Sequence, residues 1–405
     1  MALDSHNNVF GRVRNPSNSA LTAGGSSGGE GALVGIRGSI LGVGTDVGGS
    51  IRIPALCNGL YGVKPSHGRT PYAGQEGGMP EGSSKIAIEA TAGPIAHSIR
   101  DCEMFLRVIG DHRPWMFDPD VLPQSWEQQS SIHNSLGPSG NQQKKPLRIG
   151  IVRSDGITPP LPAIQRLIEE VATTLRSHPV VSLTPIQVVD VDMSGLLSQC
   201  LKISNGIFSI DGGNAWFDLL EKTSEPLSPW LQNRLRRRPA KPLDEVRKLQ
   251  AQKIAIQKKA LGVWKESGGF WQSSEPSSAP SGEQRELDVL ICPAAPHPVP
   301  PVDRWNSVNY TAAFNLLDLP AGVLPVRPMM AQDLAGELSA GNELNGWDKV
   351  NRELWGPQER KAYGGCMLSI QVVAPRLQER RLVEAMAVVD EVLRRGSNVG
   401  KSSKL

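Results

Sequence analysis

The chain contains 405 residues, of which 39% are apolar, 42 are glycine and 32 are proline. Its 43 basic and 40 acidic side chains give a formal net charge of +3, which argues against a nucleic-acid or membrane surface built on overall charge. A chain of this length can bury about 75% of the surface that its unfolded form exposes, so we expect a large apolar core that needs neither disulfides nor a structural metal.

Cysteines and histidines are dispersed along the chain. The five cysteines form no CxxC motif and have no regular spacing, and the seven histidines form no cluster with them. This pattern predicts reduced thiols and no metal site. No apolar run approaches the roughly 18 residues of a membrane span, so we expect no transmembrane helix. The cysteines are Cys57, Cys102, Cys200, Cys292 and Cys366.

The first 75 residues are rich in glycine and serine and carry little charge. Small residues at 32–36 favour a short, closely packed helix, and apolar residues at 40–43 favour a strand that enters a turn. Because few charged side chains are present, we expect main-chain N–H groups to carry any chemistry in this segment.

Helix and strand patterns alternate through the rest of the chain. Ser98 is placed as an N-cap, with Asp101 three residues later, for a helix whose apolar positions reach Ile109. This alternation favours an α/β fold with helices on both faces of a sheet. The other main elements are predicted as strands at 147–152, 288–292, 322–326 and 367–373 and helices at 163–176, 241–264 and 376–395.

Polar segments interrupt this pattern within what we expect to be a single domain, 1–405. Residues 124–145, 266–286 and 331–363 are predicted to be surface insertions, and 396–405 a flexible C-terminal tail.

The last three residues are Ser403, Lys404 and Leu405. This tripeptide is a peroxisomal address. We therefore expect a peroxisomal import receptor as a partner and a peroxisomal location, with the cytoplasm as the alternative. Homodimerisation is left open.

Two glycine-flanked serine motifs indicate acyl transfer. Gly24–Gly29 has the sequence GGSSGG, and residues 45–52 have the sequence TDVGGSIR. A serine nucleophile needs a base to remove its proton and N–H donors to stabilise the oxyanion that it creates. Gly48 and Gly49 lack a Cβ, so their N–H groups can turn inward at little steric cost. One such motif is more often a structural turn, but two in one chain favour a function.

Longer segments around these motifs carry a family resemblance. GGSSGGEGALVG followed by GVGTDVGGSIRIPALCNGLYGVKPSHGR resembles the amidase signature family of serine hydrolases. TAGPIAHSIRDCEMFLRVI, LRIGIVRSDG, DVLICPAAPHPVPP, NYTAAFNLLDLPAGVLPV and LSIQVVAPRLQERRLVEA look like its fungal acetamidase-type branch. The resemblance implies the amidase signature fold, with a mixed β-sheet core covered by helices on both faces, and hydrolysis of a small-molecule amide without a cofactor.

The resemblance also implies site residues. Ser50 would be the nucleophile and Ser26 the bridging serine, preceded by a cis peptide, in a relay that ends on a lysine. The oxyanion hole would consist of the backbone N–H groups of Val47, Gly48, Gly49 and Ser50. Ser27, Thr45, Asp46 and Arg52 would support this machinery. For Asp46 and Arg52 a purely structural ion pair is an equally good interpretation.

The lysine base that the resemblance implies is missing. In the family it lies farther upstream than the 25 residues that precede Ser26, and none of those residues is a lysine. Lys64, the first lysine, matches a separate family position in GVKPS. We therefore expect that the chain starts inside the domain, without the N-terminal part of the fold, and has little or no activity as written.

Alternative functions remain open. The chain could come from a shortened gene model of an amidase, or it could be a non-catalytic remnant or binding protein of the same fold. A third hypothesis is an amidotransferase subunit that passes ammonia to a partner.

Other motifs are weaker candidates. Gly24–Gly28 also fits GxSxG, but residues 18–23 make a poor strand before it. The start of a dinucleotide motif at 42–44 lacks the third glycine, and the P-loop-like 396–402 is one residue short. The histidines, among them His97 and His297, are expected to be structural, whereas Asp211 and Tyr310 are guesses at substrate binding.

Overall fold

The computed structural model describes residues 3–75, 82–132, 145–178, 180–181, 184–232, 234–272, 285–304, 306–339 and 341–402. Parts of two predicted insertions, 133–144 and 273–284, and the predicted address at 403–405 lie outside these ranges. Within the described residues, ten strands form one sheet. Its order is β3 (Leu41–Asp46), β5 (Thr91–Ala96), β4 (Tyr61–Lys64), β11 (Ala321–Pro328), β12 (Met367–Val373), β10 (Val289–Pro293), β6 (Leu147–Ile151), β8 (Thr184–Val191) and β7 (Val180–Val181), with β9 (Trp271–Gln272) paired to β8.

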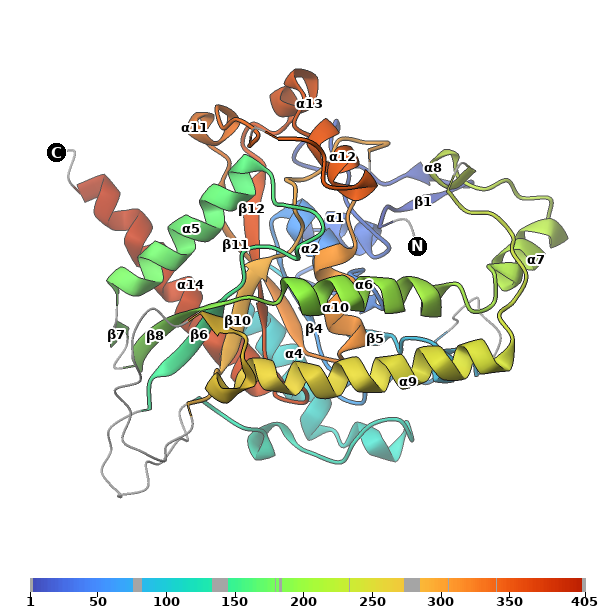
Figure 1. Cartoon of the computed structure of the whole chain (residues 1–405), viewed down its shortest axis with the longest axis horizontal. Helices are drawn as coiled ribbons and strands as arrows, with labels where there is room; N and C mark the ends of the chain where they lie inside the picture. The colour runs from blue at the N-terminus through green and yellow to red at the C-terminus, as the bar shows by residue number, and fades with distance from the viewer. Residues whose placement is uncertain are drawn as a thin grey trace.

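The sheet is mixed and covered on both faces. β6 runs parallel to β10 and β8, whereas the other pairs, such as β11 with β12, are antiparallel. Side chains alternate between two apolar cores: Val289 and Ile291 belong to one, and Leu290 and Cys292 to the other. Figure 1 shows α6 and α9 side by side across one face and α14 on the opposite face. This architecture confirms the predicted fold class.

The helices on the first core are α4 (Ile99–Asp111), α5 (Pro162–Ser177) and α14 (Glu379–Ser402), and those on the second are α6 (Ser194–Phe208), α9 (Leu243–Ala260) and α10 (Asn309–Leu316). Shorter elements are α1 (Gly28–Gly35), α2 (Arg52–Asn58), α3 (Ser83–Ile86), α7 (Asn214–Lys222), α8 (Pro229–Gln232), α11 (Ala331–Leu334), α12 (Gly346–Glu353), α13 (Pro357–Ala362), the β1 (His6–Asn7) and β2 (Gly11–Arg12) hairpin, and the 3₁₀ turns η1 (Pro114–Met116), η2 (Trp126–Gln128), η3 (Leu261–Trp264) and η4 (Glu266–Gly268).

Strongly patterned segments form the elements predicted for them. The strand predicted at 367–373 is β12, and the helix predicted after Ser98 is α4, whose Asp101 N–H donates to the Ser98 hydroxyl at 3.2 Å. Helix α10 was not predicted, because all eight of its residues are buried and it has no polar face to create a helical period.

Two segments predicted to be a surface insertion and a flexible tail contain helices in the structure. Residues 331–363 contain α11, α12 and α13, and Leu354, Trp355 and Tyr363 in this segment are buried in the core. The last helix, predicted to end at 395, continues to Ser402, so the described part of the expected tail is helical. Whether the polar segments are insertions relative to the family stays a prediction.

The structure bears on four further sequence features: the cysteines, membrane-spanning helices, metal-ligand groups and the possible dinucleotide motif. All five cysteines are free thiols. In the part of the chain that the structure describes, no helix is long and apolar enough to cross a membrane, and no group of three or more His, Cys, Asp or Glu side chains could hold a metal ion. Residues 42–44 lie inside β3 rather than at a turn into a helix, which argues against a dinucleotide site there.

Gly93 lies on β5 where β4 and the segment before α2 come close to it. A Cβ at this position would lie 2.1 Å from the Val63 carbonyl oxygen and 3.1 Å from Ile51 Cδ1. Backbone atoms cannot move aside cheaply, so we expect Gly93→Ala to destabilise the protein by about 1 to 3 kcal/mol. Gly195→Ala is the matched control, because Gly195 lies in α6 and an added methyl group there would have no atom within 4 Å. Urea unfolding midpoints should fall for the first variant and stay or rise for the second; equal midpoints would contradict this packing.

Candidate active site

The two predicted serines lie in adjacent loops. Ser50 lies between the end of β3 at Asp46 and the start of α2 at Arg52, and it is buried. Ser26 is exposed, and it follows a cis peptide bond from Gly25 just before α1. The backbone N–H of Ser27 donates to the Ser50 carbonyl oxygen at 3.3 Å. The fold therefore brings together two loops whose serines are 24 positions apart.

The beginning of the described chain supports the Ser26 loop. The Ser5 hydroxyl accepts a hydrogen bond from Gly28 N–H at 3.0 Å and lies 2.9 Å from the Ser26 carbonyl oxygen, toward which it donates. A Cβ on Gly25 would lie within 2.4 Å of the Asp4 backbone, so this glycine allows the two segments to touch. The sequence did not mark Ser5 as a site residue, because an isolated serine in a polar stretch carries no distinguishing signal.

A fully buried ion pair stands behind the Ser50 loop. Arg52 Nε and Nη2 each donate to one oxygen of Asp46 at 3.0 Å, and both side chains have no exposed surface. The same carboxylate accepts the backbone N–H groups of Gly49 at 2.7 Å and Ile51 at 3.2 Å. Burial by itself raises the pKa of Asp46, but the charge and hydrogen bonds of Arg52 outweigh it and hold the pKa well below its ordinary value. Asp46 therefore stays ionised and acts as an acceptor for the loop.

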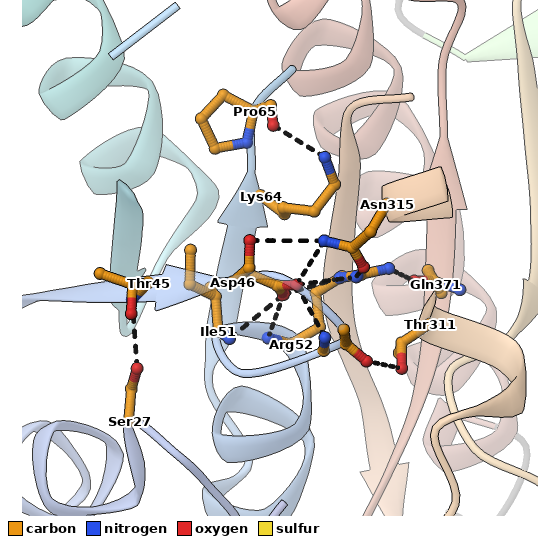
Figure 2. Close-up of polar contacts among 12 residues, drawn as sticks. Ser27, Thr45, Asp46, Ile51, Arg52, Lys64, Pro65, Thr311, Asn315 and Gln371 are labelled. Atoms are coloured by element: carbon orange, nitrogen blue, oxygen red, sulfur yellow. Dashed lines mark hydrogen bonds and ion pairs between the residues drawn. The ribbon is translucent and has the colours of Figure 1, made fainter. Parts of the chain in front are cut away.

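Two amide side chains from distant segments complete this network, which Figure 2 shows. Arg52 Nη2 donates to Asn315 Oδ1 at 2.6 Å, and Nη1 donates to Gln371 Oε1 at 2.7 Å. Asn315 Nδ2 in turn donates to Asp46 Oδ1 at 2.9 Å. Sequence analysis missed both residues. The available signal was weak: each is a single amide among apolar neighbours, in FNL at the end of α10 and IQVV in β12.

The four N–H groups expected to form an oxyanion hole differ in their contacts. The Gly49 N–H donates a hydrogen bond to Asp46 Oδ1. Within the described ranges, the N–H groups of Val47, Gly48 and Ser50 have no hydrogen-bond acceptor. Two neighbouring carbonyls are engaged: Gly48 O accepts from the Thr311 hydroxyl at 2.6 Å and Gly49 O from Ile53 N–H at 2.7 Å. Three of the four expected donors are therefore available in this geometry.

Ser27 and Thr45, the other two residues expected to support the site, are joined by a hydrogen bond. The Ser27 hydroxyl accepts a hydrogen bond from Thr45 N–H at 3.2 Å, which links the Ser26 loop to the last residues of β3 (Figure 2). Thr45 contributes here through its backbone rather than its hydroxyl. Both residues thus join the loops to each other.

Lys64 is buried on β4 beside the ion pair (Figure 2). Burial lowers the pKa of its ammonium group to about 8, although the charge of Asp318 acts in the opposite direction. Its Nζ donates to the Pro65 carbonyl oxygen at 2.8 Å, and no hydrogen bond to Ser26 or Ser50 is found among the described residues. The assignment of Lys64 to a position other than the base stays a prediction.

Other residues singled out in the sequence have structural contacts. Burial lowers the pKa of His297 to about 4, and its Nε2 accepts from Ser307 N–H at 3.0 Å. Tyr310 is buried and donates to the Thr158 carbonyl oxygen at 2.9 Å, and Asp211 accepts the N–H of Gly213 at 3.0 Å before α7. These contacts do not favour substrate-binding roles for Tyr310 and Asp211.

A surface hollow of about 310 Å³ lies beside Pro159 and Pro160. Its lining includes Arg153, Gln165 and Ile168 and none of the residues of the two serine loops. This hollow is therefore separate from the candidate site.

The buried ion pair gives a pH-dependent prediction. Arg52→Met would leave the Asp46 carboxylate buried without its partner, which should cost about 3 to 5 kcal/mol near neutral pH. In the wild type the depressed pKa of Asp46 stabilises the fold above about pH 4 and this contribution disappears as the pH falls. In the variant burial raises the pKa, so the difference between the two proteins should shrink as the pH is lowered from about 7 to about 4.

Urea unfolding across this pH range measures the difference. Arg247→Met is the matched control, because the Arg247 and Asp244 side chains are 71% and 84% exposed and such pairs contribute at most about 1 kcal/mol. A stability loss for Arg52→Met that did not depend on pH would argue against an ionised Asp46.

Known proteins are similar to this chain in both sequence and fold. A family model described as Amidase matches residues 1–383. Acetamidases from Aspergillus oryzae and Emericella nidulans are 31% and 33% identical over 396 residues, which is 97% of this chain and 67% and 66% of those proteins. This chain thus spans about two thirds of the length of these curated relatives.

Solved structures agree at the level of the fold. A fatty acid amide hydrolase superposes with a TM-score of 0.74 at 24% identity, over 97% of this chain and 63% of that one. A bacterial aryl acylamidase of the amidase signature family gives 0.62 at 20% identity, over 96% and 70%. Because the Amidase family model matches residues 1–383, which is most of this chain, the chain belongs to the amidase family.

Proposed function

We propose that this protein is an amidase-type serine hydrolase that converts a carboxamide to a carboxylate plus ammonia or an amine. The observation that carries the proposal is the contact between the two serine loops, with Ser27 N–H bonded to the Ser50 carbonyl oxygen. Family membership supplies the substrate class, because the relatives named above are acetamidases. No cofactor is part of the proposal.

In the proposed reaction the Ser50 hydroxyl oxygen attacks the amide carbon, its proton passes to Ser26, and Ser26 gives its own proton to the base that ends the relay. The tetrahedral oxyanion would accept hydrogen bonds from the N–H groups that remain available around Ser50. Ser26 would then deliver a proton to the departing nitrogen, because an amide anion is a very poor leaving group. Water would hydrolyse the resulting acyl-serine to the carboxylate and regenerate the Ser50 hydroxyl.

The proposed relay needs a base beyond Ser26. None of the residues before Ser26 is a lysine, and Lys64 Nζ is bonded to the Pro65 carbonyl. An enzyme that lacks a positioned general base reacts roughly 10²- to 10⁴-fold more slowly. We therefore propose that these 405 residues alone hydrolyse amides slowly or not at all. The alternatives are a non-catalytic binding protein of the same fold and an amidotransferase subunit that needs a partner.

Fluorophosphonate labelling and ammonia release test the proposal on the same samples. We expect a chain extended at its N terminus to include a lysine upstream of Ser26 to release ammonia or amine from short aliphatic, long-chain or aryl amides, and the present chain to do so at least about 10²-fold more slowly. Label should map to Ser50 and disappear in Ser50→Ala. Ser26→Ala should retain substrate binding but lose at least about 10² in kcat.

Ser19→Ala is the control, because Ser19 is exposed and its side chain has no part in either loop. Labelling that survives in Ser50→Ala would remove Ser50 as the nucleophile. An extended chain that binds amides without labelling or turnover would favour the binding protein, and turnover only with an added partner would favour the amidotransferase.

A further inference from the structure

One peptide unit next to Ser50 is held at both of its polar ends. The Thr311 hydroxyl, from α10, donates to the Gly48 carbonyl oxygen at 2.6 Å. On the same peptide plane, Gly49 N–H donates to Asp46 Oδ1, at the end of β3, at 2.7 Å. Figure 2 shows Thr311 and Asp46 reaching this loop from different elements. Rotation of this peptide would break both hydrogen bonds at once.

The carbonyls that follow are also held. Gly49 O accepts from Ile53 N–H at 2.7 Å, and Ser50 O accepts from Ser27 N–H at 3.3 Å. Three consecutive carbonyls around the candidate nucleophile therefore have donors. Of the three donors, Thr311 is the one that comes from a distant segment and uses a side chain, so its hydroxyl can be removed without altering the loop sequence.

Thr311 is itself fixed in place and shapes the loop. It has no exposed surface, and its hydroxyl oxygen also lies 3.2 Å from the Val308 carbonyl oxygen one turn earlier. Gly49 adopts a φ of +132°, and a Cβ there would lie 2.5 Å from Thr311 Oγ1. Two constraints therefore favour glycine at position 49. The positive φ disfavours residues with a Cβ, and Thr311 occupies the space that a side chain would need.

We infer that Thr311 is a positioning residue for Ser50, holding the Gly48–Gly49 peptide against Asp46. This inference rests on the proposed function. The clamp directs the Gly49 N–H away from the reaction, so the oxyanion donors are drawn from Val47, Gly48 and Ser50 rather than from all four residues. Because donor direction matters most when charge develops on the substrate oxygen, loss of the clamp should slow the chemical step more than it weakens substrate binding.

Two substitutions separate the hydroxyl from the packing. Thr311→Val removes the hydroxyl and keeps a branched side chain, whereas Thr311→Ser keeps the hydroxyl. In the chain extended to include an upstream lysine, we expect Thr311→Val to lower kcat for amide hydrolysis by about 10- to 100-fold with KM changed less than about threefold, and Thr311→Ser to stay within about threefold of the wild type. Thr91→Val is the matched control, because Thr91 is buried in β5 and its hydroxyl bonds to no described residue.

A second readout does not depend on activity. Hydrogen exchange followed by mass spectrometry on peptides spanning residues 46–51 should show exchange at Gly49 at least about tenfold faster in Thr311→Val, and unchanged in Thr311→Ser and Thr91→Val. This measurement works on the present 405 residues as well. If Thr311→Val failed to fold, Thr311→Ala would remove the hydroxyl without placing a methyl group where the hydroxyl was.

The outcomes distinguish the two proposals. Absence of turnover and Ser50 labelling in the unsubstituted extended chain would overturn the proposed function, while the exchange data would still decide whether Thr311 holds the peptide. Faster exchange with unchanged kcat would overturn the positioning role. An equal loss of kcat in Thr311→Ser, or unchanged exchange in Thr311→Val, would assign the effect to packing and overturn the clamp.

Discussion

The buried ion pair between Asp46 and Arg52 is the interaction on which the candidate site depends. Removing two charges from water is costly, and such a pair persists only when every polar atom around it finds a partner. Here the Asp46 carboxylate accepts from Arg52, Gly49, Ile51 and Asn315. Since two of these donors are backbone N–H groups of the Ser50 loop, the pair does more than stabilise the core. It determines the path of the chain on both sides of Ser50.

Strand geometry explains why distant residues reach this pair. Adjacent residues of a strand point to opposite faces, so Ile370 and Val372 join one apolar core while Gln371 faces the other way. There its amide bridges Arg52 Nη1 and the Tyr310 carbonyl oxygen in α10. Helix α10 precedes β11, the neighbour of β12, and therefore lies over the same region of the sheet. The central strands thus act as a frame that delivers Asn315, Thr311 and Gln371 to one place.

The Ser26 loop depends on weaker, more local support. The Ser5 hydroxyl and the Thr45 N–H donate neutral hydrogen bonds to this loop, its Ser27 N–H donates to the Ser50 carbonyl oxygen, and Ser26 itself is exposed. The two serines therefore differ in environment: Ser50 is buried in a loop whose neighbouring N–H groups bond to the charged Asp46 carboxylate, whereas Ser26 is exposed. In the proposed relay, where Ser26 takes the proton of Ser50, this difference in exposure favours a final base that approaches from the side of Ser26.

Local sequence patterns determined much of this protein. Period and capping predicted β12, α4 and most of α9 within a few residues, and glycine-flanked serines marked both loops, because these signals depend on neighbours in the chain. Helix α10 lacked a polar face, and Asn315, Gln371 and Thr311 are ordinary residues in apolar runs. Their contacts were decided by the tertiary structure alone, because a buried polar group bonds to partners that are near it in space, whatever their spacing along the chain.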